Sequence, residues 1–192
     1  KKFLYYLIVL AVVILMYAGA HYFLLQQFEN VGNKIQIDIN EEIRPSTDFV
    51  DLMTNFGDQY FENGTYQNTS KYYSMLTYDE KKNQFSMDEY GHDSKHSGVG
   101  NLTGVGVVPL AGIKREEMEL ALSYNAFFEE IYHRLKQSER IYYISESDFV
   151  ITYPWVSSDE FSYSEAMKNE AYYLAVKPEN NPFRRPVWTP VY

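Results

Sequence analysis

The stretch IYYISESDFVITY, residues 141–153, contains two β-rich runs separated by a short polar segment. The first run is Ile141–Ser145 and the second is Phe149–Tyr153, and both are rich in the β-branched and aromatic residues that favour strands. The three residues between them are Glu, Ser and Asp, which suit a tight turn. The stretch therefore predicts an antiparallel β-hairpin, with alternate residues of each strand on the same face.

A helical pattern comes before the hairpin. From Lys114 to Gln137, apolar residues recur at spacings of three and four, as they do on the buried face of an amphipathic helix. Tyr72–Tyr78 and Gly104–Val108 read as strands, and Ser162–Val176 predicts a short helix before a last strand. Helices and strands in this order predict an α+β fold with a largely antiparallel sheet.

The N-terminal segment is apolar. Phe3–Leu25 contains no Asp, Glu, Lys or Arg, and a helix of this length crosses a hydrocarbon core of about 30 Å. Lys1 and Lys2 place the N-terminus in the cytoplasm by the positive-inside rule. We therefore expect residues 1–25 to be a transmembrane anchor. A signal peptide cleaved after Ala20 is the alternative, and both readings export the chain from about residue 26 onward.

Residues 26–62 are predicted to be a long exported helical segment that is broken or bent near Pro45. Ile35 and Ile39 fit either a strand, with Ile37, or a helical stripe, with Ile43, so this part of the pattern leaves both open. Beyond Pro45, Phe49, Met53, Phe56 and Tyr60 mark one face of a helix, a pattern that is also compatible with dimerisation.

The overall charge restricts the partners of the protein. The chain has 17 basic and 26 acidic residues, a net charge of -9, and it contains no cysteine. Nucleic-acid binding needs a concentrated positive field, so a nucleic-acid partner is not expected. Disulfides and thiolate metal sites are excluded. His92 and His96 have a spacing that could hold a metal on a helix, but the glycines around them favour a loop, so neither a metal nor a cofactor is predicted.

The hairpin and the end of the chain together resemble a known family. IYYISESDFVITYPW, followed by PENNPFRRPVWTPVY, resembles the membrane-distal module of double Cache domains. These are PAS-like extracytoplasmic sensors of bacterial histidine kinases, diguanylate cyclases and chemoreceptors in the inner membrane. The resemblance implies a Cache module over residues 63–192 that is incomplete at its C-terminus, with a second module, a second membrane helix and an effector domain beyond it.

The resemblance also implies a ligand site and a mode of signalling. Family members bind small molecules, including amino acids and other carboxylates, through an arginine, a tryptophan and tyrosines near this segment. We therefore expect a small-molecule ligand, with anions among the candidates, and a homodimer. The residues expected to bind the ligand are Arg184, Arg185, Trp188, Tyr192, Tyr153 and Trp155. The spacing of Arg185 and Trp188 and the Thr189 that follows depart from the family's amino-acid pattern.

Each expected ligand residue also has an ordinary structural interpretation. The arginines could pair with surface carboxylates, and the aromatic residues Trp188, Tyr192, Tyr153 and Trp155 could be packing residues. Two other functions are weighed against sensing. One is an anchored periplasmic module that binds another protein and has no small-molecule pocket. The other is an exported hydrolase, which is disfavoured because no nucleophile–base motif is visible.

Overall fold

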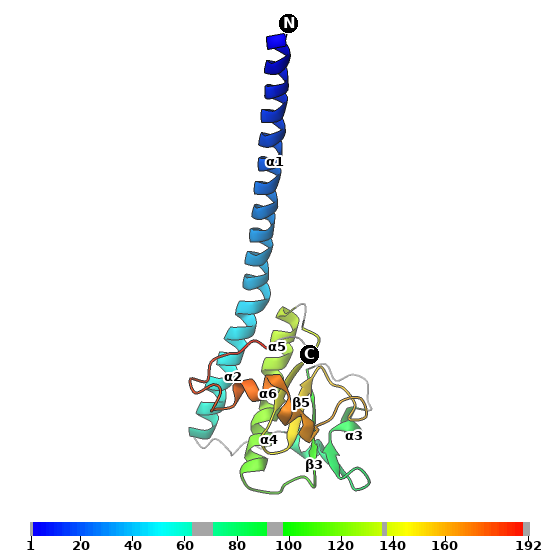
Figure 1. Cartoon of the computed structure of the whole chain (residues 1–192). Helices are drawn as coiled ribbons and strands as arrows, with labels where there is room; N and C mark the ends of the chain where they lie inside the picture. The colour runs from blue at the N-terminus through cyan, green and yellow to red at the C-terminus, as the bar shows by residue number, and fades with distance from the viewer. Residues whose placement is uncertain (1, 63–70, 92–97, 136–137, 190–192) are drawn as a thin grey trace. The chain divides into compact units, whose positions relative to one another are not determined.

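The computed structural model describes residues 2–62, 71–91, 98–135 and 138–189 (Figure 1). The chain divides into two compact units, Lys1–Arg44 and Pro45–Tyr192. The α+β class is confirmed, because a five-stranded antiparallel sheet and several helices form the second unit. The helices and strands, in chain order, are α1 Lys2–Asp38, η1 Ile39–Ile43, α2 Arg44–Glu62, η2 Tyr73–Met75, β1 Thr77–Asp79, β2 Gln84–Ser86, α3 Asp88–Gly91, β3 Asn101–Val105, α4 Ile113–Ser123, α5 Asn125–Arg134, β4 Ile141–Ile144, β5 Phe149–Tyr153, η3 Glu165–Asn169 and α6 Ala171–Val176.

The first unit is dominated by α1, which has 37 residues and is about 56 Å long at about 1.5 Å per residue. Among the described residues, one helix near the N-terminus is long and apolar enough to cross a membrane, judged by length and composition. The described side chains of α1 are exposed. The membrane anchor itself therefore remains a prediction, which this helix supports.

Residues 26–62 are helical, as expected, and their irregularity lies just before Pro45. Ile39–Ile43 form a π-helical turn, in which the backbone N–H of Arg44 bonds to the carbonyl of Ile39. Proline has no N–H to donate and crowds the preceding turn, so a locally wider helix accommodates Pro45 without a break. Ile37 itself lies in α1, so a strand around this residue is ruled out.

The sheet has the strand order β1-β2-β3-β5-β4, with every neighbouring pair antiparallel. The predicted hairpin is confirmed as β4 and β5, and Ile141 pairs with Tyr153 at its open end. All five residues of β5 are buried. Because β5 lies between β3 and β4, it joins the hairpin to the rest of the sheet.

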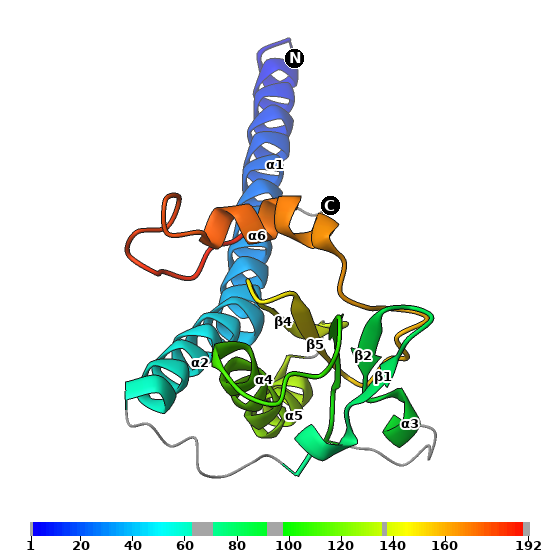
Figure 2. The same cartoon turned by 90° about the horizontal axis from the view of Figure 1, so that it is seen from below.

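One face of the sheet packs against helices. Phe85, Leu102, Phe149 and Ile151 project from this face and are completely buried. They form a core with Leu120 and other residues of α4 and α5, and side chains of α2 pack against it. Figures 1 and 2 show α4 and α5 beside the sheet. This apolar face supplies the main driving force for folding, because it removes large side chains from water.

The other face of the sheet is more polar. Asn101, Thr103 and Thr152 lie on this face, and each is at most 2% exposed. The segment after β5 covers it: the backbone N–H of Tyr163 donates to Thr103 Oγ1 at 3.0 Å, and Asn101 Nδ2 donates to the carbonyl of Val156 at 2.8 Å. The buried polar side chains thus tie the covering segment to the sheet.

Three predicted elements differ from the structure. Most of Tyr72–Tyr78 is not a strand: Tyr73–Met75 form a 3-10 turn, which buries Tyr73 and Leu76 on the same side. The strand expected over Gly104–Val108 begins earlier, as β3. The single helix expected over 114–137 is divided at Tyr124 into α4 and α5, as far as the structure describes it.

The end of the chain also differs from expectation. No strand occurs between residues 183 and 189, and residues 190–192 lie outside the described part of the chain. The short helix expected over Ser162–Val176 is present as η3 followed by α6.

Gly104 gives a test of the packing between β2, β3 and β5. A Cβ at this position would overlap the Phe85 ring and lie 2.7 Å from both the carbonyl oxygen of Asp148 and the Cβ of Phe149. We expect Gly104→Ala to lower the free energy of unfolding by about 1–3 kcal/mol, because overpacking strains a filled core. The neighbouring Val105→Ala, at an exposed position, should change it by no more than about 0.5 kcal/mol. Urea denaturation of the full chain in detergent measures both, and equal effects would contradict the packing described here.

Candidate ligand-binding pocket

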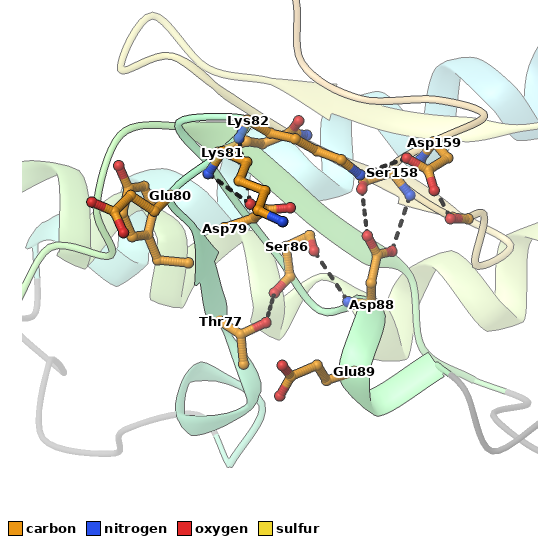
Figure 3. A pocket seen from close by; sticks show the side chains of 13 residues that line it. Thr77, Asp79, Glu80, Lys81, Lys82, Ser86, Asp88, Glu89, Ser158 and Asp159 are labelled. Atoms are coloured by element: carbon orange, nitrogen blue, oxygen red, sulfur yellow. Dashed lines mark hydrogen bonds and ion pairs between the residues drawn. The ribbon is translucent and has the colours of Figure 1, made fainter.

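A pocket of about 650 Å³ lies at the β1–β2 edge of the sheet (Figure 3). Pockets that hold small molecules are commonly of this size. It is formed by the β1–β2 hairpin, the first residues of α3 and the loop after β5. Its lining residues are Thr77, Tyr78, Asp79, Glu80, Lys81, Lys82, Gln84, Ser86, Asp88, Glu89, Ser157, Ser158 and Asp159.

The pairing of β1 with β2 explains the polar character of the hairpin wall. Thr77 is opposite Ser86 and Asp79 is opposite Gln84, so these four residues share one face. Phe85, between the two β2 residues, points to the opposite face and is completely buried. The period-2 alternation therefore gives this hairpin an apolar core side and a polar pocket side.

Asp88 is the most highly connected carboxylate in the pocket. Its Oδ1 accepts hydrogen bonds from Asn101 Nδ2 at 2.9 Å and from the backbone N–H of Ser158 at 3.0 Å, and the Ser158 hydroxyl donates to its Oδ2. Asn101 in turn accepts from the backbone N–H of Met87 at 3.0 Å. These bonds join the start of α3 and the loop after β5 to the buried sheet.

The same bonds control the ionisation of Asp88. Burial acts to raise the pKa of its carboxyl group, but hydrogen bonds from Ser158, Ser86 and Asn101 together hold that pKa below its usual value. Asp88 is therefore a carboxylate over the whole physiological pH range.

A second contact crosses the pocket. Lys82 Nζ lies 2.6 Å from Asp159 Oδ1 and links the hairpin turn to the loop after β5 (Figure 3). This hydrogen bond raises the pKa of Lys82. The side chains of Lys82 and Asp159 are 45% and 76% exposed, so the ion pair contributes little to stability, but it neutralises one of the two lysines in the pocket.

The remaining charges leave the pocket acidic. The lining contains five carboxylates and two ammonium groups, a formal charge of -3. Within the described structure, no ion pair or side-chain hydrogen bond involves Glu80 or Glu89, and both are exposed. The electrostatic character of this pocket is therefore negative.

A smaller apolar groove of about 270 Å³ lies at the opposite edge of the sheet. It is lined by side chains of α2, the α4–α5 region and β4, including Phe49, Met53, Phe128 and Ile141. It shares no residue with the acidic pocket.

Of the residues expected to bind ligand, Tyr153 is in the helix-facing core. It is 6% exposed, and its ring packs against the rings of Phe128 and Tyr132, at centroid distances of 6.4 and 5.5 Å. Trp155 is half-buried, and its Nε1 has no hydrogen-bond partner in the described structure. Neither residue lines either of the two pockets.

The two arginines and Trp188 lie on an exposed segment. Arg184, at a positive φ of 48°, approaches Asp58 at 3.6 Å, and the Arg185 guanidinium lies 5.5 Å from the centre of the Phe183 ring. Trp188 is 63% exposed. Tyr192 lies outside the described residues. No hydrogen bond, ion pair or ring contact joins any two of the five described members of this set, and their role in ligand binding remains a prediction.

The residues that build the acidic pocket were not identified from the sequence. Asp88 bonds to a serine 70 positions later, and Asn101 bonds to a carbonyl 55 positions later. The only local signal is the polar alternation of Gln84 and Ser86 around Phe85, which marks a half-buried strand but does not indicate what faces its polar side. His92 and His96 lie outside the described residues, and the described part of the chain contains no group of three potential metal ligands.

Asp88 allows a test of the network that shapes the pocket. We expect Asp88→Asn to lower the free energy of unfolding by about 1–3 kcal/mol at pH 7, because an amide NH2 group would face hydrogen-bond donors. Since the folded-state pKa of Asp88 is lowered, its contribution is present above the unfolded-state value of about 3.9 and is lost as the pH falls through the folded-state value. The difference between the variant and the parent should therefore shrink below about pH 4.

Denaturant titrations of the full chain in detergent at several pH values measure this difference. Glu89→Gln, which removes the neighbouring charge without breaking a described hydrogen bond, is the control and should change stability by no more than about 0.5 kcal/mol. An Asp88→Asn effect as small as that of the control would contradict the network.

Comparisons of the chain with protein-family models, with curated proteins and with solved structures found no match. Membership of the double Cache family therefore remains a prediction from the sequence resemblance.

Proposed function

We propose that this chain is the ligand-sensing input region of a bacterial transmembrane receptor, with a PAS-like module of the Cache type outside the membrane. In this proposal a small molecule binds the module, and the N-terminal helix anchors it in the inner membrane. The chain itself would carry no catalytic activity. The observation that carries the proposal is the polar hollow of about 650 Å³ on one face of an otherwise well-packed sheet.

An unpartnered polar group supports a ligand on this side of the sheet. Gln84 Nε2 is buried without a hydrogen-bond partner in the described structure, and Gln84 lines the hollow. Buried polar atoms without partners are rare in folded proteins, and in this proposal a small turn of the Gln84 side chain brings its amide to a polar ligand.

The way the pocket is closed supports a signalling role. Its two walls belong to the β1–β2 hairpin and to the loop after β5, and Lys82–Asp159 and Asp88–Ser158 connect them. A ligand that binds between the walls would favour one separation over another. A signal requires this kind of differential affinity for two conformations.

The apolar groove favours a second candidate function, an anchored module that binds another periplasmic protein. Such an interaction would use Phe49, Met53 and Ile141, and it would not require the acidic pocket. Blocking the acidic pocket should abolish small-molecule binding under the first proposal, and blocking the apolar groove should abolish protein binding under the second.

A thermal-shift screen of the full chain in a non-ionic detergent tests the sensing proposal. With amino acids, organic acids and amines as the library, we expect at least one compound to raise the unfolding temperature by roughly 5 °C at about 100 times its Kd, because binding to the folded state alone stabilises that state. Thr77→Trp, which places a large ring in the pocket, should abolish this shift.

Val107→Trp is the matched control, because Val107 is 66% exposed and lies outside the pocket. It should leave the shift unchanged. If no compound stabilises the chain, or if both tryptophan variants respond as the parent does, ligand sensing by this pocket is wrong.

A further inference from the structure

We propose that the acidic pocket selects a positively charged organic amine, a conclusion that rests on the sensing function proposed above. The sequence resemblance points instead towards carboxylates bound by arginines. The described pocket contains no arginine, and its carboxylates outnumber its ammonium groups by five to two.

The cations already in the pocket are poorly placed to hold an anion. Lys82 is engaged with Asp159 at 2.6 Å, so only Lys81 has an ammonium group without an ionic partner in the described structure. An anionic ligand would have to break the Lys82–Asp159 pair or be stabilised by Lys81 alone, while facing Asp79, Glu80, Asp88 and Glu89. Like charges at close range cost binding energy, so this lining discriminates against anions.

The carboxylates are arranged to receive a cation. Glu80 follows β1 and Glu89 lies at the start of α3, so the two occupy separate places on the pocket rim (Figure 3). Asp88 lies between the hairpin and the loop and is kept ionised by its hydrogen bonds. A ligand with more than one ammonium group could therefore pair with separate carboxylates.

The uncharged part of the lining points to an organic ligand and away from a bare metal ion. Gln84 also lines the pocket, and its amide can donate to a hydroxyl or carbonyl oxygen on the same ligand. Thr77, Ser86 and Ser157 also line the pocket with hydroxyl-bearing side chains. In addition, no three carboxylate or imidazole groups of the described residues are grouped closely enough to hold a metal.

Three four-carbon probes test the charge preference. 1,4-Diaminobutane, succinate and 1,4-butanediol have the same carbon skeleton and differ in charge, and calcium chloride serves as a metal probe. Isothermal titration calorimetry with the full chain in non-ionic detergent should show saturable binding of the diamine alone.

A pair of double variants shows whether that binding occurs in the pocket. Glu80→Gln/Glu89→Gln removes two pocket charges, and Glu165→Gln/Glu179→Gln removes two exposed charges outside it. We expect the pocket variant to weaken diamine binding by about tenfold or more and the control by less than about twofold. Unfolding temperatures measured without ligand confirm that each variant is folded. If Glu80→Gln/Glu89→Gln does not fold, the single variant Glu89→Gln replaces it, and we expect that variant to weaken diamine binding by about threefold.

The outcomes separate the amine proposal from the sensing proposal. Binding of succinate, the diol or calcium in the absence of diamine binding would overturn the proposal that the pocket selects an amine. If the bound probe is succinate or the diol, the proposal that the pocket senses a small molecule would still stand. Equal diamine affinity in both double variants would show diffuse attraction to an acidic protein and would also overturn the inference. If no probe binds and the wider screen finds no ligand, both proposals fail.

Discussion

The burial of β5 on both faces is the constraint on which the rest of the second unit depends. Every residue of this strand is buried, and it pairs with β3 on one side and β4 on the other. Ile151 faces the core formed with α4 and α5, whereas Thr152 faces the opposite, more polar layer. A strand buried in this way needs a cover on each face, so the helices and the segment after β5 are both required to complete the fold.

The two covers differ in how they are held. The helical cover is apolar and is held mainly by burial of large side chains. The cover on the other face is attached through hydrogen bonds to buried polar residues, notably Asn101 and Thr103. Hydrogen bonds fix direction more strictly than apolar contacts do. The acidic pocket lies where this polar cover meets the β1–β2 hairpin.

The chemistry of the pocket does not match that expected from the family resemblance. The arginines and Trp188 lie on an exposed segment after α6, and Tyr153 faces the helices, so the described members of the expected site are not brought together. The pocket is formed instead by carboxylates, hydroxyls and one amide. A sensor of the kind proposed above would therefore select a positively charged ligand, whereas the arginines of the C-terminal segment suggest a negatively charged one.

Local sequence pattern is enough to predict the elements whose residues are close together in the chain. The β4–β5 hairpin, the long N-terminal helix and the amphipathic pattern of α4 and α5 follow from local periodicity and turn chemistry. Local pattern failed at Tyr73, where burial of Tyr73 and Leu76 favoured a 3-10 turn over a strand. The location and lining of the pocket follow only from the tertiary structure, because Asp88 contacts Ser158, which lies 70 residues later. Contacts so distant in sequence depend on strand order and register, which local patterns do not encode.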